Sequence, residues 1–109
     1  MGRGLSKSEF DHLFSSGRRR SLPQVRLFSG SGTGRIGIAT SRKIGNRPQR
    51  NRQRRVALEI VRNLGGVPPN VDVILLLQES FAQGDFSEKQ LWIETLFQQI
   101  RKDSAEDSA

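Results

Sequence analysis

The feature that most constrains the fold is an aliphatic run in the second half of the chain. The run VDVILLL, residues 71–77, is broken by a single aspartate and follows the helix-breaking pair Pro68-Pro69. A strand with one face in water alternates apolar and polar side chains, whereas a near-continuous aliphatic run is typical of a strand covered on both faces. We therefore expect residues 71–77 to form a central strand.

The length of the chain favours a single domain. A sequence of 109 residues can bury one modest core, so we expect a single domain over residues 1–109, with the acidic stretch 103–109 as a disordered tail. The absence of cysteine excludes disulfide frameworks, thiolate zinc sites and a cysteine nucleophile. Because no apolar run approaches the ~20 residues that span a bilayer, we expect a cytoplasmic protein with no membrane partner.

Two capping boxes predict helices near the two ends of the chain. The first begins at Ser6, and the apolar stripe that follows it predicts a short amphipathic helix. The second is assigned to Ser87 and Gln90, with Phe86 and Leu91 as a hydrophobic staple. The helix that follows is expected to end near Lys102, and its apolar stripe continues through Leu96, Phe97 and Ile100.

Two segments between the first helix and residue 41 are predicted to be extended. Residues 24–28 and 35–40 are rich in strand-forming side chains. The glycine-rich stretch 30–34 between them lacks the G-x-G-x-x-G spacing and the lysine of phosphate-binding loops. We interpret it as the loop of a β-hairpin.

A third helix is bracketed by Pro48 and the pair Gly65-Gly66, residues typical of a helix start and a helix end. Its C-terminal part carries apolar residues at core-facing spacing, namely Val56, Ala57, Ile60, Val61 and Leu64. Its N-terminal part, residues 47–55, is almost wholly polar and basic. The helix is therefore expected to dock by its C-terminal part and to expose its N-terminal part.

The charge of the chain is strongly asymmetric. The net charge is +7 and the isoelectric point about 11.3. Up to Arg62 there are fifteen lysines and arginines against three acids, whereas the remainder has three bases against eight acids. Such an asymmetry indicates one surface that binds a polyanion, with the acidic half turned elsewhere.

The arginines of residues 47–55 follow helical spacing. Arg47, Arg50 and Arg54 lie on one stripe, and Arg52 and Arg55 on a neighbouring face. Like charges this close repel by a few tenths of a kcal/mol per pair, which phosphate binding would offset. A guanidinium can donate two hydrogen bonds to one phosphate. We also expect unpaired amides and the positive end of the helix dipole near Asn46 to attract phosphate.

The residues around this helix resemble the signature of a known family. Residues 35–46 read RIGIATSRKIGN, and residues 50–55 read RNRQRR. This order is similar to the ribonuclease P protein subunit, whose signature is a strand ending in Ser-Lys/Arg-Lys, then Gly-Asn, then a helix opening with Arg-Asn-Arg. The sequence departs from the family at Ala57-Leu58-Glu59, where another base is often found. Our hypothesis is that Arg47 compensates for that missing base.

The resemblance implies an α/β fold of the α+β two-layer sandwich type. It implies a central, mostly antiparallel four-stranded sheet with helices, a left-handed βαβ crossover and a ribosomal protein S5 domain 2-like topology. It also implies two RNA partners, ribonuclease P RNA and precursor tRNA, whose 5′ leader the complex removes. Mg²⁺ would be bound by the RNA subunit, which would carry the catalysis, and not by a protein site.

The resemblance also assigns site residues. Those implied to bind the catalytic RNA are Arg42, Lys43, Asn46, Arg47, Arg50, Asn51, Arg52, Arg54 and Arg55. Those implied to line a leader-binding cleft between the first helix and the sheet are Phe10, Phe14, Arg26 and Phe28. Aromatic rings suit this role because bases stack on them without sequence preference.

The residues themselves suggest no catalytic centre. The one histidine, His12, is expected to face solvent on the first helix. The acids Asp72, Glu79, Asp85 and Glu88 are scattered over strand, loop and helix start, with no spacing that converges on a metal. We therefore expect a non-catalytic subunit of an endoribonuclease, with no catalytic or metal-binding residues of its own.

Two other functions stay open at this point. A basic ribosomal or RNA-chaperone protein would have similar size and charge, but it would have no role in cleavage and no dependence on precursor tRNA. A DNA-binding regulator would place the arginine helix in a major groove. However, no helix-turn-helix partner precedes that helix, and Asn51 alone is weak base readout, so DNA is not an expected partner.

Overall fold

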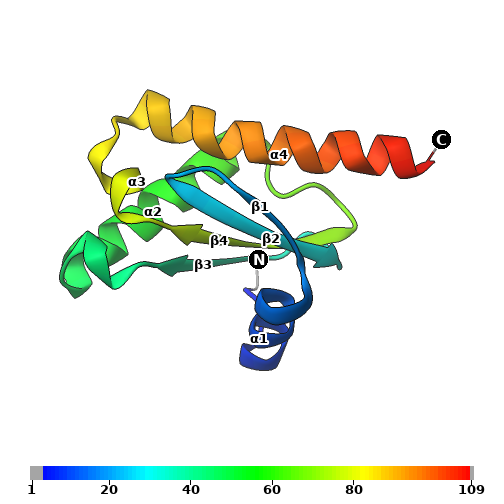
Figure 1. Cartoon of the computed structure of the whole chain (residues 1–109), viewed down its shortest axis with the longest axis horizontal. Helices are drawn as coiled ribbons and strands as arrows, with labels where there is room; N and C mark the ends of the chain where they lie inside the picture. The colour runs from blue at the N-terminus through cyan, green and yellow to red at the C-terminus, as the bar shows by residue number, and fades with distance from the viewer. Residues whose placement is uncertain (1–3, 109) are drawn as a thin grey trace.

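The computed structural model describes the backbone of residues 4–108 and the side chains of residues 4–102. Its elements follow one another along the chain as shown in Figure 1. They are α1 (Lys7–Ser16), β1 (Arg18–Ser21), β2 (Val25–Ser31), β3 (Ile36–Thr40), the 3-10 helix η1 (Arg42–Ile44), α2 (Arg47–Asn63), β4 (Val71–Leu77), α3 (Glu79–Gln83) and α4 (Phe86–Ser108). The α+β class expected from the sequence is confirmed.

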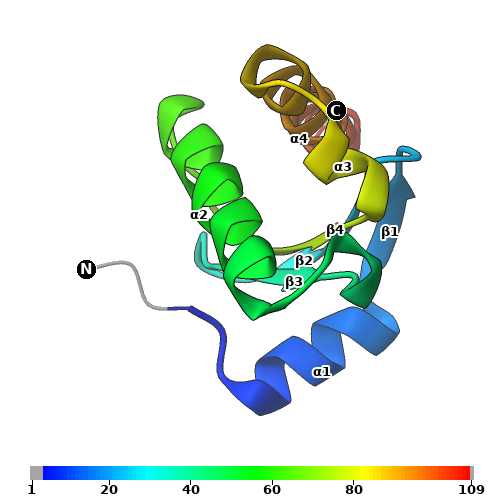
Figure 2. The same ribbon diagram turned by 90° about the vertical axis from the view of Figure 1, so that its left-hand side faces the viewer.

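The four strands form one mixed sheet in the order β1-β2-β4-β3. Strand β4 pairs antiparallel with β2 and parallel with β3, so the prediction of a central strand at 71–77 is confirmed. The side chains of Val73, Ile74 and Leu75 are fully buried, as a strand covered on both faces requires. The connection from β3 through α2 to β4 is the expected left-handed crossover (Figure 2).

The interpretation of residues 30–34 as a hairpin loop is wrong. Strands β2 and β3 are not neighbours, because β4 lies between them. The glycine-rich stretch instead crosses the start of β4, where the Gly32 N–H donates to Asn70 O (3.0 Å) and the Gly34 N–H donates to Val71 O (2.9 Å). The glycines of this stretch do form a connection between two strands, but the composition of a connection does not decide which strands pair.

Helices cover the two faces of the sheet unequally. Figure 2 shows α2, α3 and α4 on one face and α1 alone on the other. The main core lies under α2 and α4 and includes Leu27, Leu75, Ile60 and Phe97. A smaller core of Leu13, Phe28 and Ile74 lies beneath α1. The position of α1 adds a partial third layer to the two-layer sandwich and leaves part of that sheet face uncovered by a helix.

The ends of α2 match the prediction from sequence. Asn46 caps the helix, and Gly65 and Gly66 follow it with φ angles of 92° and 90°, a conformation that favours glycine. Three of the five apolar residues predicted to face the core are buried, and the other two pack against it. The buried residues are Ala57, Ile60 and Val61, and the partly buried ones are Val56 and Leu64.

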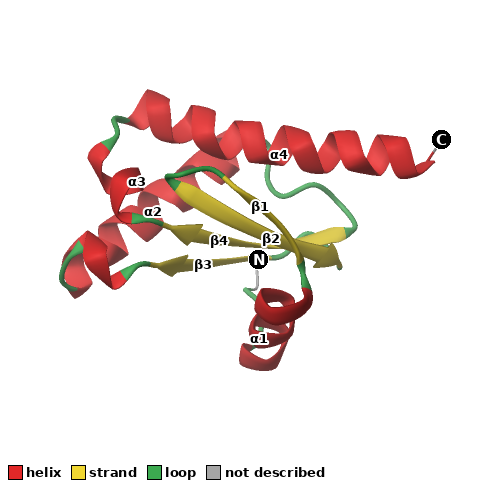
Figure 3. Cartoon of the chain, in the orientation of Figure 1, coloured by secondary structure: helices red, strands yellow, loops and turns green. Residues whose placement is uncertain are grey.

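Helix α4 and one strand differ from the prediction. The α4 cap is Asp85, whose Oδ1 accepts from the Glu88 N–H at 2.8 Å, and not Ser87. Phe86 and Leu91 are 42% and 59% exposed and therefore form no buried staple. Helix α4 extends to Ser108 as one continuous element, past the predicted end and through 103–108 of the expected tail (Figure 3). The arginine run before residue 21 forms edge strand β1, which the sequence analysis missed.

Candidate nucleic-acid interface

The N-terminal half of α2 presents a basic groove. Its lining consists of Arg47, Arg50, Asn51 and Arg54, which is the stripe predicted from helical spacing. Arg47 and Arg54 are exposed, and Arg54 Nη1 donates to Asn51 Oδ1 across 2.9 Å. No acidic side chain in the described part of the molecule lines the groove, so its guanidinium groups are available to an anion.

The turn before α2 adds two further cations. Ser41 caps η1 by accepting from the Lys43 N–H at 3.2 Å, and this short helix exposes Arg42 and Lys43. The chain then turns at Gly45, which has a φ of 143° and lies so close to Gln49 that a Cβ there would meet its side chain. The tight turn places η1 directly against the start of α2.

The amides at the start of α2 are less available than the sequence suggested. Asn46 Oδ1 accepts from the Gln49 N–H (3.1 Å), and Gln49 Oε1 accepts from the Asn46 N–H (2.8 Å). Pro48 has no N–H to offer. The prediction of unpaired amides near Asn46 is therefore wrong for Asn46 and Gln49, whose N–H groups are used by this capping box. The helix dipole and the side chains remain as the attraction for an anion.

The five arginines of residues 47–55 do not all line the same groove. Arg52 lines a separate pocket together with Gln49, Gln53 and Lys89, on the opposite side of the helix from Arg47 and Arg54. Arg55 is exposed on the surface between these two sides. The predicted second face of Arg52 and Arg55 is thus present, but Arg52 lies on the side of α2 that faces α4.

Three phenylalanines form a continuous stack on the α1 side of the sheet. The ring centroids of Phe10 and Phe14 are 6.0 Å apart, and those of Phe14 and Phe28 are 4.5 Å apart with an interplanar angle of 24°. Phe14 is 40% exposed, whereas Phe28 is 5% exposed. Phe14 can therefore offer area to a base, while Phe28 supports it from below.

The sheet face beside α1 becomes more exposed toward the end of β4. Ile74 is fully buried beneath α1, Leu76 two residues later is half-buried, and Arg26, its partner on β2, is exposed. Helix α1 can lie close to β3 because Gly37 has no side chain, and a Cβ there would lie 3.0 Å from the Phe10 ring. Arg26 and Phe28 are two residues apart on β2, so their side chains lie on this same face of the sheet. The four residues proposed for the leader are therefore brought to one side of the sheet.

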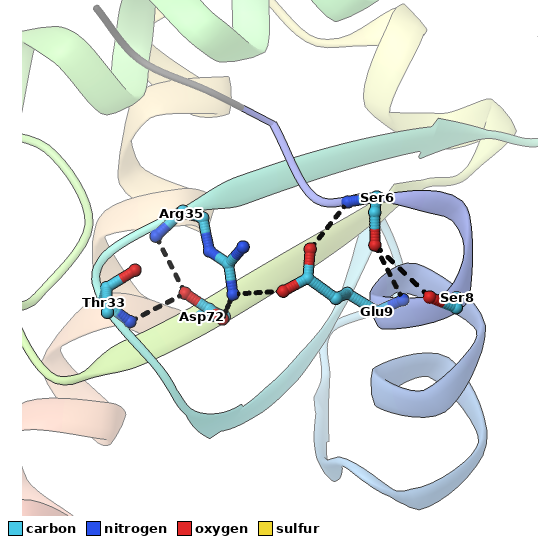
Figure 4. A network of polar contacts seen from close by, with 6 residues as sticks. All are labelled: Ser6, Ser8, Glu9, Thr33, Arg35 and Asp72. Atoms are coloured by element: carbon cyan, nitrogen blue, oxygen red, sulfur yellow. Dashed lines mark hydrogen bonds and ion pairs between the residues drawn. The ribbon is translucent and has the colours of Figure 1, made fainter.

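Helix α1 is tied to the sheet by an ionic network (Figure 4). Arg35 Nη2 lies 2.6 Å from Glu9 Oε2 and 2.9 Å from Asp72 Oδ2. Asp72 Oδ1 also accepts from the backbone N–H groups of Thr33 and Arg35, both at 3.0 Å. The network links α1, the loop before β3 and the central strand, and it fixes the position of the aromatic stack.

The pKa values of Asp72, Glu9 and Arg35 are shifted in the directions that favour their charged forms. Burial raises the pKa of Asp72, but the hydrogen bonds from Arg35 and Thr33 outweigh it, so the pKa lies below its ordinary value. The Ser6 backbone N–H and the Arg35 guanidinium lower the pKa of Glu9. The hydrogen bonds to Asp72 and Glu9 raise the pKa of Arg35. All three groups are therefore charged at neutral pH.

Two residues near these surfaces were not predicted from the sequence. Lys89 is buried beside Arg52, but a single lysine in the first turn of a helix gives no signal of that position. Arg19 is exposed and pairs with Phe28 across β1 and β2, which places it on the aromatic side of the sheet. Residues 18–20 are three arginines in a row, so the run shows no alternation of apolar and polar side chains that could have indicated a strand.

The residues considered for catalysis stay apart. His12 is exposed, as expected, and lines two shallow pockets beside α1. Within residues 4–102, no group of three or more histidine, aspartate or glutamate side chains could hold a metal ion. No helix in the described part of the chain is both long and apolar enough to cross a membrane.

Comparison with known proteins decides the family. The family model described as Ribonuclease P matches residues 3–101. The chain belongs to the ribonuclease P protein family. A search of curated proteins found no match.

Solved structures of ribonuclease P proteins share this fold. A Staphylococcus aureus RNase P protein mutant with defective mRNA degradation activity matches with a TM-score of 0.80 at 18% identity, covering 89% of this chain and 86% of that one. The RNase P protein from Thermotoga maritima matches with a TM-score of 0.79 at 22% identity, covering 89% of this chain and 96% of that one. At these identities the likeness shows the fold alone.

In this ribonuclease P family member the signature residues 35–46 form one structural unit. They comprise strand β3, the cap Ser41, the 3-10 helix η1, the turn at Gly45 and the cap Asn46. Gly37, Ser41, Gly45 and Asn46 each have a local structural role, and the cations Arg42 and Lys43 between them are exposed. The signature therefore both starts α2 and supplies its basic surroundings.

Proposed function

We propose that this chain is the non-catalytic protein subunit of a ribonuclease P ribonucleoprotein. It binds the catalytic RNA with the basic end of α2 and the 5′ leader of precursor tRNA with the aromatic side of the sheet. The observation that carries the proposal is the groove lined by Arg47, Arg50, Asn51 and Arg54 in a chain of this family. Cleavage chemistry and its Mg²⁺ ions belong to the RNA.

The groove is suited to an RNA backbone because it collects positive charge without an acid to neutralise it. Each phosphate contact releases condensed counterions, so binding by such a groove weakens steeply as salt increases. Arg42 and Lys43 extend the basic surface beyond the helix start. Asn46 acts in this interface as the helix cap, and its direct contact with RNA is not required by the proposal.

The aromatic side of the sheet is suited to a single strand. Phe14 provides an exposed ring, Phe10 extends the stack, and Arg26 supplies an exposed cation on the same sheet face. Stacking on aromatic rings and contact with backbone phosphates are both tolerant of sequence, as leader recognition across many precursor tRNAs requires. The two RNAs would thus meet different sides of one small domain.

The decisive experiment is cleavage of a leader-bearing tRNA by the cognate ribonuclease P RNA at low magnesium, with and without the chain. The proposal expects strong stimulation, because the protein screens phosphate repulsion and positions the leader. A ribosomal or RNA-chaperone protein would bind structured RNA without a preference for precursor tRNA. Absence of stimulation at saturating protein would refute the proposal and leave that alternative.

A further inference from the structure

A second polar pocket lies on the side of α2 that faces away from the basic groove. It has a volume of about 400 Å³ and is lined by Ile44, Gln49, Arg52, Gln53, Ala82 and Lys89. These residues come from η1, α2, α3 and the first turn of α4. The pocket therefore joins segments of the chain that are far apart in the sequence.

Lys89 is an unusual residue for such a place. It is 7% exposed, its Nζ donates to Gln53 Oε1 across 2.9 Å, and the same atom lies 5.4 Å from the centre of the Phe81 ring. Within residues 4–102 no carboxylate forms an ion pair with it. Burial lowers the pKa of Lys89, and the nearby charge of Arg52 lowers it further, against an opposing effect of Asp85.

A buried ammonium without a counterion is costly, because it has lost water and gained only partial compensation. Lysine has three N–H donors, and Gln53 takes one of them. An anion in the pocket would accept from the remaining donors and neutralise the charge. The side chain is thus held where a negatively charged group would stabilise it.

The other polar side chains that line the pocket are donors as well. Gln49 Oε1 and Gln53 Oε1 both accept hydrogen bonds from the protein, which leaves their amide nitrogens as donors. Arg52 contributes a guanidinium from the exposed rim. Among residues 4–102 no acid lines the pocket, so its lining suits a phosphate, which accepts several hydrogen bonds at once.

We propose that this pocket binds a phosphate group of an RNA backbone, with Lys89 and Arg52 as its charged contacts. The choice of RNA rests on the function proposed above. The pocket and the groove lie on opposite sides of the first turns of α2. A folded RNA that receives the end of this helix would therefore be contacted from both sides, and not only along one stripe.

The first test uses inorganic phosphate and the full chain, followed by nuclear magnetic resonance of backbone amides. We expect shifts at Gln53, Ala82 and Lys89 that saturate, with a dissociation constant raised roughly tenfold or more in Lys89→Met and Arg52→Gln. Methionine fills about the same space beside Phe81 as the lysine side chain, and Arg52 is exposed, so neither substitution should unfold the protein. If one variant is nevertheless misfolded, the other still tests the proposal. Arg54→Gln is the matched control in the groove and should leave these shifts unchanged. No saturating shifts in the parent chain, or equal affinity in all variants, would overturn the proposal.

The second test uses ribonuclease P RNA and the salt dependence of its affinity. Lys89→Met should reduce the slope of log affinity against log salt by up to about 0.9, the contribution of one phosphate of a nucleic-acid duplex. Lys89→Arg keeps the positive charge and should retain the slope of the parent chain. An unchanged slope in Lys89→Met beside a reduced slope in Arg54→Gln would reject the pocket and keep the proposed function. Undetectable binding of that RNA by the parent chain would reject the proposed function, while the phosphate titration would still report on the pocket.

Discussion

Arg35 Nη2 donates to Asp72 Oδ2 across 2.9 Å, and so joins the residue before β3 to the second residue of the central strand β4. The same nitrogen contacts Glu9 on α1, although Glu9 lies 26 residues before Arg35 and 63 residues before Asp72 in the sequence. The guanidinium therefore sets the distance between α1 and the sheet. Because Phe10 and Phe14 are on α1, this contact also positions the aromatic stack proposed to bind the leader.

Replacement of Asp72 by alanine should destabilise the fold. The change leaves the backbone N–H groups of Thr33 and Arg35 and the Arg35 guanidinium without their acceptor. We expect the free energy of unfolding to fall by about 1–3 kcal/mol, the usual cost of unsatisfied buried donors. Urea denaturation measures this change. Glu59→Ala, which alters an exposed acid on α2, is the control and should have little effect.

The same network predicts a stability that depends on acid pH. The folded-state pKa values of Asp72 and Glu9 lie below their ordinary values, so their contribution is present above those values. It is lost as the pH falls through the lowered, folded-state pKa values. Urea denaturation from about pH 7 to about pH 3 should show this loss, and Asp72→Asn should show a smaller one. Identical pH profiles for the two proteins would contradict the assignment.

The groove predicts a graded loss of RNA affinity. Arg50→Gln and Arg54→Gln should each weaken binding to ribonuclease P RNA and reduce the salt slope by up to about 0.9, because each removes one phosphate contact. Filter binding over a range of salt concentrations measures both quantities. Arg101→Gln removes the same charge from the exposed surface of α4 and should leave the slope unchanged. A slope that changes equally in all three variants would indicate net charge alone.

The aromatic stack predicts a selective loss for the leader. Phe14→Ala should weaken binding of precursor tRNA to the complex by about 1–3 kcal/mol, the contribution of one stacked base, and leave mature tRNA unaffected. Comparison of the two tRNAs by equilibrium binding measures the difference. Leu91→Ala removes an exposed apolar side chain on α4 and is the control. Equal weakening for precursor and mature tRNA would count against the leader assignment.

Phe28 should behave differently from Phe14 although the two rings are in contact. Phe28 is 5% exposed and packs against Leu13 and Ile74. Its replacement by alanine should lower the free energy of unfolding by about 3–5 kcal/mol, as expected for a large buried aromatic residue. Thermal or urea denaturation measures this loss. A stability close to that of the parent chain would show that the ring is not part of the core.

Much of the local structure could be predicted from the sequence, because local signals decide it. Pro48 and the pair Gly65-Gly66 mark the ends of α2 through their backbone preferences. The arginine stripe could be predicted as well, since helical spacing alone places Arg47, Arg50 and Arg54 on one side. The aliphatic run of β4 predicted its central place, because only burial on both faces accommodates it.

The functional surfaces depend on contacts that local spacing does not encode. Residues 30–34 have the composition of a hairpin loop, yet β4 inserts between β2 and β3 and the loop crosses it. Phe14 and Phe28 are the same apolar residue type, yet the packing of the chain exposes Phe14 and buries Phe28.

The sequence by itself determined the helices α1, α2 and α4, the central strand, the basic character of α2 and, through its signature, the family. Only the tertiary structure decided that Arg52 turns away from the arginine stripe toward Lys89, and that Arg35 joins Glu9 to Asp72. The physical reason is that backbone preference and periodicity act over a few residues. Contacts between distant residues depend instead on which surfaces must be buried together when the whole chain packs.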